Sequence, residues 1–475
     1  MNARPNIIFI NTDQHTWDAV SALGNQHVKT PNIDWLHREG IAFHKSYSAD
    51  PVCAPARASW MTGVYGSENG VPFNGGHMHA DIPDLGQLLN QGGYHAVHSG
   101  KWHIEGRDVR DSFNNLYVGK AHIGASGGEF YDKVSTHAVI DFLDSYDDVK
   151  PFFLHMGIID PHDICQYQHN HEDKIMPGPF EQFLSVKDEL PPLPENFVYD
   201  GDETVLQQVF RRGDDPLIHP AIHNRVKDWT ELQWRFMAWN HNRFVEAADD
   251  HIGMVLNALF NSRFSDNTII IFSVDHGEAN GRHESFQKFS LYEESIRVPF
   301  VIASLGNKFV IPKNVIDDRH FISGVDLMPT VLDYAGINVP EHVQGRSVKP
   351  LVEQSDVQWR TFAYVESNYW ARAVITERYK YVMEYRPRTE EDFMPIGPDK
   401  ESVGKEQLFD LVNDPMETEN LSQNSVYSDV LDDCRERLLL MESGLKRRPL
   451  DGGKSKETVL DWLAPLNARW KNKVD

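Results

Sequence analysis

Cys53 and Arg57 are separated by three residues, Ala-Pro-Ala, in a segment that could carry anion chemistry. Residues 58–63 read as the first turns of a helix, so Cys53 would stand at a helix N-terminus. Backbone N–H groups and the helix dipole favour anions there, and Arg57 would lie on the same helix face. A nucleophile and a fixed cation could therefore meet an oxidised sulfur or phosphorus substrate at one point. The cysteine phosphatase loop is excluded, because it needs five residues between Cys and Arg.

Three short apolar runs, each followed by polar residues, are typical of parallel strands buried on both faces. The runs cover residues 6–10, 152–159 and 268–274, and the polar residues just beyond them include Asp13, His162, Asp275 and His276. Ligands of open α/β sheets bind beyond the carboxyl ends of the strands. We therefore expect these side chains to share one site.

The clearest helical pattern runs from Trp229 to Leu259, where Thr230 and Gln233 resemble a capping box. Strands that alternate with long helices predict an α/β sheet covered on both sides.

Residues 187–228 are rich in Pro, Asp and Arg and show no sustained periodicity. We expect that segment to be an excursion over the surface that lines the substrate entrance.

The character of the chain changes after Leu351. Residues 360–365, 372–376 and 379–383 are typical of strands, and a helix that contains Cys434 follows them. Cys434 shares a helical stripe with apolar residues, so we expect it in a core. These patterns predict two domains, an α/β catalytic domain over residues 1–355 and a small α+β subdomain over residues 356–475.

Length and composition limit the class of protein. The 475 residues are 40% hydrophobic and 24% charged, as in a globular protein, and the net charge of −24 argues against nucleic acid as a partner. No run is long enough for a membrane span. Without an apolar signal region, the chain as written is expected to be cytoplasmic, or periplasmic or secreted if a leader was trimmed. Three cysteines are too few for a disulfide framework, and the oligomeric state stays open.

The Cys-x-Pro-x-Arg pattern resembles the signature of type I sulfatases, members of the alkaline phosphatase superfamily. Further segments are similar to that family's motifs and follow its order from Asn6 to about Leu421. They are Gly100–His103, Asp160–His162, Asp275–Gly277, Lys288 with Tyr292-Glu293 and Arg297–Pro299, and Leu408–Pro415 with Glu417, Asn420 and Leu421. The resemblance implies an alkaline phosphatase-like α/β fold, with a large, mostly parallel sheet between helices and a small C-terminal antiparallel sheet with one helix.

The same resemblance implies a set of site residues. Cys53 would be oxidised after translation to formylglycine by a maturation enzyme, the one protein partner we infer. The catalytic residues would be Cys53, Arg57, Lys101, His103, His162 and Lys288. The residues that contact the substrate would be Asn74, Lys101, His162 and Lys288. The ligands of one divalent metal would be Asp13, Gln14, the modified Cys53, Asp275 and His276.

The expected metal is Ca²⁺, with Mn²⁺ and Mg²⁺ as alternatives. Asp13 and Asp275 supply hard oxygen ligands, which suit all three cations. A lone aspartate at a strand end is more often a cap, but two of them beside family motifs favour ligands. Gln14 and His276 stand where the family commonly has an aspartate and an asparagine. Choline sulfatases and phosphonate monoester hydrolases look similar in having Asp-Gln and Asp-His.

The implied reaction is the hydrolysis of a sulfate ester. One hydroxyl of the formylglycine hydrate would attack sulfur, while His162, aided by Lys288, protonates the departing alcohol. His103 would then remove the proton of the second hydroxyl, which expels sulfate and restores the aldehyde. Because phosphonate monoesters and phosphodiesters carry the same single charge, hydrolysis of those esters is one alternative. A catalytically silent polyanion-binding protein is another, if Cys53 stays a thiol.

The substrate would be a small-molecule or oligosaccharide sulfate ester. A sugar could stack on the aromatic residues Trp17, Trp102, Tyr369 and Trp370, which favours a sulfated saccharide. Isolated tryptophans, however, more often belong to a core.

Some further residues could be interpreted as functional, but for each we prefer a structural or solvent-exposed role. His77, His79 and the tract 169–171 are expected in solvated loops, and Cys165 is expected to be a buried, inert thiol.

Overall fold

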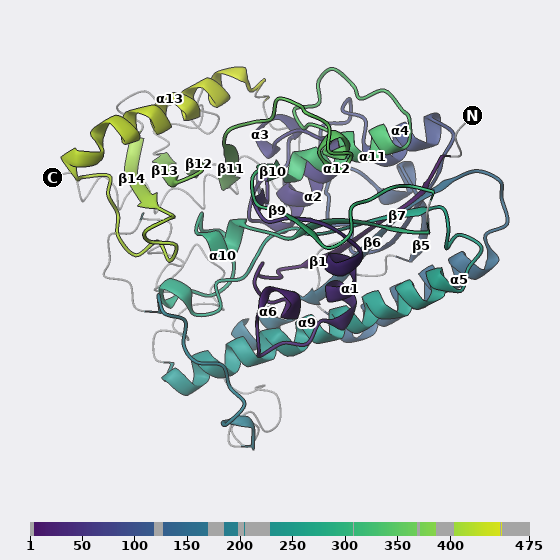
Figure 1. Ribbon diagram of the computed structural model, residues 1–475, viewed down its shortest axis with the longest axis horizontal. Helices are drawn as coiled ribbons and strands as arrows, with labels where there is room; N and C mark the ends of the chain where they lie inside the picture. Colours follow the sequence, from purple (N-terminus) through teal and green to yellow (C-terminus); the bar gives the residue numbers. More distant parts are fainter. Residues whose placement is uncertain are drawn as a thin grey trace.

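The centre of the computed structural model is an eight-stranded sheet with the order β5-β4-β6-β1-β7-β8-β2-β9 (Figure 1). The structure describes residues 4–117, 127–169, 185–197, 204, 229–306, 308–367, 371–385, 403–446 and 448. Strand β1 (Asn6–Asp13) lies between β6 (Phe152–Pro161) and β7 (Thr268–Val274), and both pairings are parallel. The three apolar runs predicted as buried strands are therefore neighbours in one sheet.

The other strands extend this sheet on both sides. β4 (His95–Gly100) and β5 (Asn114–Tyr117) continue it in parallel beyond β6. On the other side, β8 (Phe300–Leu305) runs antiparallel to β7 and to β2 (Gly40–Phe43), and β9 (Val315–Asp317) pairs in parallel with β2. Two short strands, β3 (Ser46–Tyr47) and β10 (Ile322–Ser323), form a separate parallel pair. The predicted large, mostly parallel sheet is confirmed.

Helices cover both faces of this sheet because successive side chains of its strands point to opposite sides. Ile8 and Ile10 of β1 pack in a core with α1 (Pro31–Glu39), α5 (Gly128–Ser145) and α9 (Glu231–Phe260). Ile7 and Phe9 pack in the opposite core with α2 (Cys53–Thr62), α4 (Leu85–Gln91) and α11 (Leu327–Tyr334). Figure 1 shows these two sets of helices on opposite sides of the strands.

Helix α9 begins where the sequence predicted it. The Thr230 side chain accepts a hydrogen bond from the Gln233 backbone N–H, and the Gln233 side chain accepts one from the Thr230 N–H at 2.8 Å. The short helical elements are η1 (Ser21–Leu23), α3 (Gly66–Asn69), η2 (Val109–Asp111), α6 (Ile164–His169), η5 (Arg282–Glu284), α10 (Glu293–Ile296), η6 (Gly324–Asp326), α12 (Lys349–Val352) and η8 (Ser425–Tyr427).

The C-terminal part forms a second, antiparallel sheet with the order β11-β12-β13-β14. Its strands are β11 (Ala363–Ser367), β12 (Ala371–Ile375), β13 (Tyr379–Tyr385) and β14 (Val403–Asp410). Helix α13 (Ser428–Gly444) packs Leu431, Cys434 and Leu438 against this sheet. The predicted small sheet with one helix, and the core position of Cys434, are confirmed.

The other face of the small sheet packs against the larger part of the molecule. Val365, Ala373 and Val382 share a core with Leu291 and Ile296, which belong to the segment that carries Lys288 and α10. Within that contact, the buried Lys380 of β13 forms ion pairs with Glu417 and, at 3.3 Å, with Glu293 of α10. The division of the chain at residue 355 stays a prediction.

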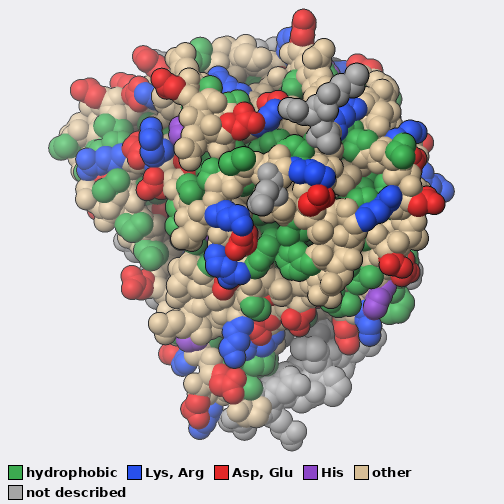
Figure 2. All heavy atoms as spheres, turned by 45° about the vertical axis from the view of Figure 1, so that its right-hand side comes forward, with side chains coloured by type: hydrophobic (Ala, Val, Ile, Leu, Met, Phe, Trp, Pro, Cys, Tyr) green, Lys and Arg blue, Asp and Glu red, His purple; other side chains and the backbone are tan. Residues whose placement is uncertain are grey.

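The surface shown in Figure 2 carries intermixed acidic and basic side chains around hydrophobic ones, with no continuous basic band on that face. Across the described part of the chain, none of the helices combines the length and the hydropathy that crossing a membrane requires. Most of the predicted surface excursion over residues 187–228 lies outside the described residues.

Candidate active site

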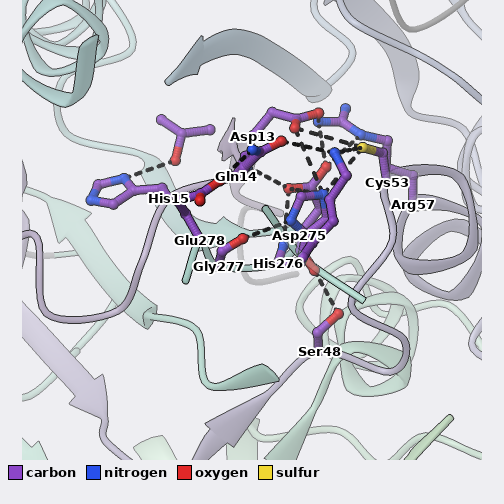
Figure 3. Close-up of polar contacts among 12 residues, drawn as sticks. Asp13, Gln14, His15, Ser48, Cys53, Arg57, Asp275, His276, Gly277 and Glu278 are labelled. Atoms are coloured by element: carbon purple, nitrogen blue, oxygen red, sulfur yellow. Dashed lines mark hydrogen bonds and ion pairs between the residues drawn. The ribbon is translucent and has the colours of Figure 1, made fainter. Parts of the chain in front are cut away.

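The predicted site residues converge where β1, β7 and α2 meet (Figure 3). Asp13 is the last residue of β1, and Asp275 and His276 directly follow β7, the neighbouring parallel strand. Cys53 is the first residue of α2, as the sequence predicted, and is 1% exposed. The parallel pairing brings both strand ends to one edge of the sheet, and α2 begins at that edge.

Four of these side chains form a compact cluster of potential metal ligands. One ligand atom from each of Asp13, Cys53, Asp275 and His276 lies within 4.8 Å of the others, and all four residues are buried. The Cys53 Sγ is 3.1 Å from His276 Nε2 and 3.7 Å from Asp13 Oδ1. Two carboxylates that face an imidazole and a thiol fit a divalent cation. The donor set therefore suits the metal that the sequence implied.

Gln14 faces the same cluster from the end of β1. Its Oε1 accepts a hydrogen bond from Lys288 Nζ at 2.8 Å, and that ammonium group also lies 3.1 Å from the Cys53 Sγ. Gln14 has a positive φ of 62°, a left-handed conformation that is uncommon for a residue other than glycine. Its backbone N–H donates to Asp275 Oδ1 at 3.1 Å, which fixes this turn beside the cluster.

Buried cations balance the two aspartates. The Arg57 guanidinium donates through Nε to Asp275 Oδ2 and through a terminal nitrogen to Asp13 Oδ2, both at 3.0 Å. Its other terminal nitrogen donates to the Lys101 carbonyl at 3.0 Å, and Lys101 Nζ lies 2.6 Å from Asp13 Oδ2. Arg57 is fully buried, so its charge first serves to hold the two carboxylates in place.

This arrangement shifts the pKa values of the cluster. Burial and the nearby Cys53 would raise the pKa of Asp13, but Lys101, His162 and Arg57 bring it below its ordinary value. Burial and the charge of Asp13 raise the pKa of Asp275 to about 6. Burial also opposes ionisation of Cys53, yet Lys288, Lys101 and His276 lower the pKa of its thiol well below the ordinary value. The site therefore stabilises negative charge at residue 53.

His162 and His103 approach Cys53 from other segments. His162 follows β6, and burial together with Lys101 lowers its pKa to about 4. The neighbouring His103 helps to lower the pKa of the Cys53 thiol, and the thiol in turn opposes the lowering of the His162 pKa. His103 has a positive φ of 55°, and its Nε2 lies 3.8 Å from Glu105 Oε1. Both histidines predicted to transfer protons thus act on the electrostatics of Cys53.

Asn74 lies at the start of α2 and not at the sulfur. Its Oδ1 accepts a hydrogen bond from the Ala54 backbone N–H at 3.0 Å. Val52, the residue that precedes the helix, provides no side-chain cap of its own. Asn74 therefore caps α2 from a neighbouring loop and fixes the backbone beside Cys53.

The sequence analysis missed Glu278, a side chain that touches Gln14, and it misjudged one histidine. Cys165 Sγ donates to Gln14 Oε1 at 3.3 Å, and burial raises its pKa to about 12, which agrees with the predicted inert thiol. Glu278 accepts a hydrogen bond from Gln14 Nε2. Its position two residues after His276 was the only signal available in the sequence. The expectation of a solvated His79 is wrong, because that side chain is buried beside the turn at Gly70.

The aromatic residues named as sugar contacts divide into three groups. Trp102 is buried in the main core, where it packs against His98 and Phe113. Trp17 is half-buried, and the Arg297 guanidinium lies 4.0 Å from its ring centre. Tyr369 and Trp370, as well as the side chains of the tract 169–171, lie outside the described residues.

The chain belongs to the sulfatase family. The family model described as Sulfatase matches residues 5–337, and that of the N-sulphoglucosamine sulphohydrolase C-terminal region matches residues 281–443. The family assignment made from the motifs is confirmed, and so is the enzyme class, a sulfuric ester hydrolase.

Similar proteins extend over nearly the whole chain. An N-acetylglucosamine-6-O-sulfatase of Bacteroides thetaiotaomicron is 26% identical, over 96% of this chain and 89% of the relative. A structure of a protein in complex with its substrate D-glucosamine-2-N,6-O-disulfate is 25% identical, with a TM-score of 0.71 over 92% of this chain and 97% of that one. The phosphonate monoester hydrolase of Agrobacterium radiobacter shares the fold at 22% identity, with a TM-score of 0.71 over 93% and 96% of the two chains.

Proposed function

We propose that the protein hydrolyses a sulfate ester of a saccharide through a formylglycine formed at Cys53 and with the help of one divalent metal. Ca²⁺ is the preferred candidate for this metal. The observation that carries this proposal is the Cys53 side chain at the start of α2, in contact with Lys288 and His276 and beside two buried aspartates. A thiol that served only for packing would have apolar neighbours. Here the neighbours are the groups that a nucleophile and an anionic ester need.

Maturation of Cys53 requires an oxidising enzyme that replaces the thiol by an aldehyde. Asp13, Gln14, Asp275 and His276 would hold the metal together with the modified residue. When bound, the cation would neutralise the ester and favour ionisation of the attacking hydroxyl. Arg57 would hold both aspartates in place through its contacts with the two carboxylates, and Lys101 would assist at Asp13.

Lys101 and Lys288 supply the positive charge that faces the ester. Both are buried, and their charges, together with that of His276, lower the pKa of the Cys53 thiol. A sulfate ester carries one negative charge and gains charge on its leaving oxygen as the S–O bond breaks. Buried cations stabilise that charge more than solvated ones would, because little water screens them.

His162 is the proposed acid for the leaving alcohol, and His103 the proposed base for the second hydroxyl of the hydrate. The lowered pKa of His162, about 4, means that its imidazole is neutral at pH 7 before an ester binds. An anionic ester between Lys101 and Lys288 offsets their charge, which favours protonation of His162 when the substrate binds. The proton would then pass to the ester oxygen as the alcohol leaves, and His103 would take the proton whose loss expels sulfate.

We propose a saccharide as the alcohol because the names of similar proteins refer to sulfate esters of sugars. The second candidate is a phosphonate monoester, favoured by the shared fold of the phosphonate monoester hydrolase and by Gln14 and His276 in the metal set. Kinetics with matched aryl sulfate, aryl phosphonate and sulfated-glucosamine esters tests both. A higher kcat/KM on the sulfates supports the proposal, and a higher value on the phosphonate would replace it by the second candidate.

The same preparation should be analysed for its modification. Intact-mass analysis of the peptide with residue 53 distinguishes formylglycine from the thiol. Turnover that rises in proportion to the formylglycine content supports the nucleophile assignment. Equal turnover in fully unmodified protein would remove it.

A further inference from the structure

Glu278 is a fully buried carboxylate that connects two parts of the site. It follows His276 by two residues, in the segment after β7 (Figure 3). Its Oε2 accepts a hydrogen bond from Gln14 Nε2 at 2.5 Å. Its Oε1 accepts one from the Gln287 backbone N–H at 2.5 Å, and Gln287 directly precedes Lys288. Both carboxylate oxygens thus face N–H donors, the arrangement that suits an ionised group.

The contact with Gln14 matters because a carboxamide has two unlike ends. Its oxygen accepts hydrogen bonds and can bind a cation, whereas its NH₂ group can do neither. Since the Glu278 carboxylate only accepts, it takes the NH₂ end of Gln14. The Gln14 Oε1 is then directed towards Lys288 Nζ at 2.8 Å and accepts also from Cys165 Sγ at 3.3 Å. A rotation of the amide by half a turn would set an acceptor against the Glu278 carboxylate and a donor against the Lys288 ammonium group.

The contact with Gln287 bears on the segment that carries Lys288. Five non-glycine residues between 280 and 289 have positive φ values, namely Asn280, His283, Glu284, Gln287 and Phe289. Such conformations are unfavourable for these residue types and persist where surrounding contacts enforce them. The hydrogen bond from the Gln287 N–H to Glu278 is one such contact, one residue before the lysine.

We infer that Glu278 is a positioning residue, which orients the Gln14 carboxamide so that its oxygen serves the metal and fixes the backbone that presents Lys288. The inference rests on the proposed function, because it assigns Gln14 to the metal. Glu278 itself touches neither the substrate nor the cation. Partners of this kind commonly change metal affinity about 10–100-fold when they are replaced.

The variant Glu278→Gln tests the inference with almost no change in volume. A glutamine offers one oxygen where the carboxylate offers two, so it cannot accept from both Gln14 and Gln287 without a donor facing a donor. The expected result is a Ca²⁺ affinity about 10–100-fold weaker than that of the wild type. The measurement is isothermal titration of the metal-free protein with Ca²⁺ alone, so it needs neither turnover nor a known substrate.

A double-mutant cycle separates positioning from a general structural role. In the Gln14→Glu background, the new carboxylate meets Glu278, and Glu278→Gln supplies a donor that matches it. There, Glu278→Gln should leave Ca²⁺ affinity equal or tighter. A merely structural role predicts the same loss in both backgrounds, and that result would overturn the inference, as would unchanged affinity of the single variant. If Glu278→Gln alone fails to fold, the comparison within the Gln14→Glu background decides, and a tenfold or greater loss there overturns it.

Glu294→Gln is the matched control. Glu294 is a buried residue of α10 whose Oε1 lies 3.7 Å from His283 Nε2. Within the described residues its side chain forms no ion pair with the metal cluster or Gln14, so its variant should keep the wild-type Ca²⁺ affinity. Failure of the proposed function gives a different pattern. In that case the wild type itself would bind neither Ca²⁺ nor Mn²⁺, whereas failure of the inference leaves wild-type binding intact.

Discussion

Replacing Arg57 by lysine should expose how much the buried guanidinium does for the two aspartates. Arg57 makes three hydrogen bonds of 3.0 Å, to Asp13, Asp275 and the Lys101 carbonyl, from three different nitrogens. A lysine side chain ends in a single nitrogen instead of the three of a guanidinium. It can therefore keep about one of these contacts. Asp13 would retain Lys101 Nζ at 2.6 Å, so Asp275 would lose the most.

The magnitude follows from the bonds that disappear. One hydrogen bond to a carboxylate contributes about 1.5–3 kcal/mol, and one to a backbone carbonyl about 0.5–1.5 kcal/mol. Their loss should destabilise the metal-free protein by about 2–4 kcal/mol. A bound cation would balance the negative charge of Asp275 in place of the lost guanidinium contact. The destabilisation should therefore shrink by about half in saturating Ca²⁺.

Thermal unfolding of the wild type and of Arg57→Lys, each in chelator and in excess Ca²⁺, measures this difference. The Tm of the variant should fall by several degrees in chelator and by less in Ca²⁺. Arg107→Lys is the control, because Arg107 is a buried partner of Asp84 at 2.7 Å outside the site and should lose the same Tm in both conditions. If Arg57→Lys were as stable as the wild type in chelator, or lost the same Tm with and without Ca²⁺, the assignment of Arg57 as the partner of two aspartates that bind the metal would be refuted.

Other predictions concern the nucleophile, the metal and the acid. Cys53→Ala should reduce turnover to background with an unchanged Tm. Cys53→Ser should release at most one equivalent of alcohol, because its sulfate ester has no second hydroxyl. Sustained turnover by either variant would contradict the mechanism. Chelation should inactivate the enzyme, Ca²⁺ or Mn²⁺ should restore it, and Asp13→Ala or Asp275→Ala should lose metal by elemental analysis together with activity; full metal content would remove that residue from the ligand set. His162→Ala should slow esters of sugar alcohols about 10²–10⁴-fold and activated aryl esters far less, as measured by kcat/KM; equal losses would assign His162 to binding and make Lys288 the candidate acid.

Much of the fold could be predicted because its signals are local. Three apolar runs are long enough for strands and too short for helices, and each is buried on both faces as β1, β6 or β7. The capping box at Thr230 marks the start of α9 for the same reason, since its two hydrogen bonds join residues three apart. β14 was not predicted as a strand, because its residues were interpreted as a family motif. Its strand conformation depends on antiparallel pairing with β13, which folding brings beside it.

The sequence by itself determined the family, the position of Cys53 at the start of a helix and the strand ends at which Asp13, Asp275 and His276 lie. Motif order and residue type carry that information, and parallel strands necessarily bring their carboxyl ends to one edge of the sheet. Only the tertiary structure decided how the charges are distributed among partners. Arg57 reaches both Asp13 and Asp275, Asn74 caps α2, and Glu278 holds Gln14 across 264 positions of sequence. Such contacts depend on distances of about 3 Å between segments that folding brings together, and no periodicity along the chain encodes them.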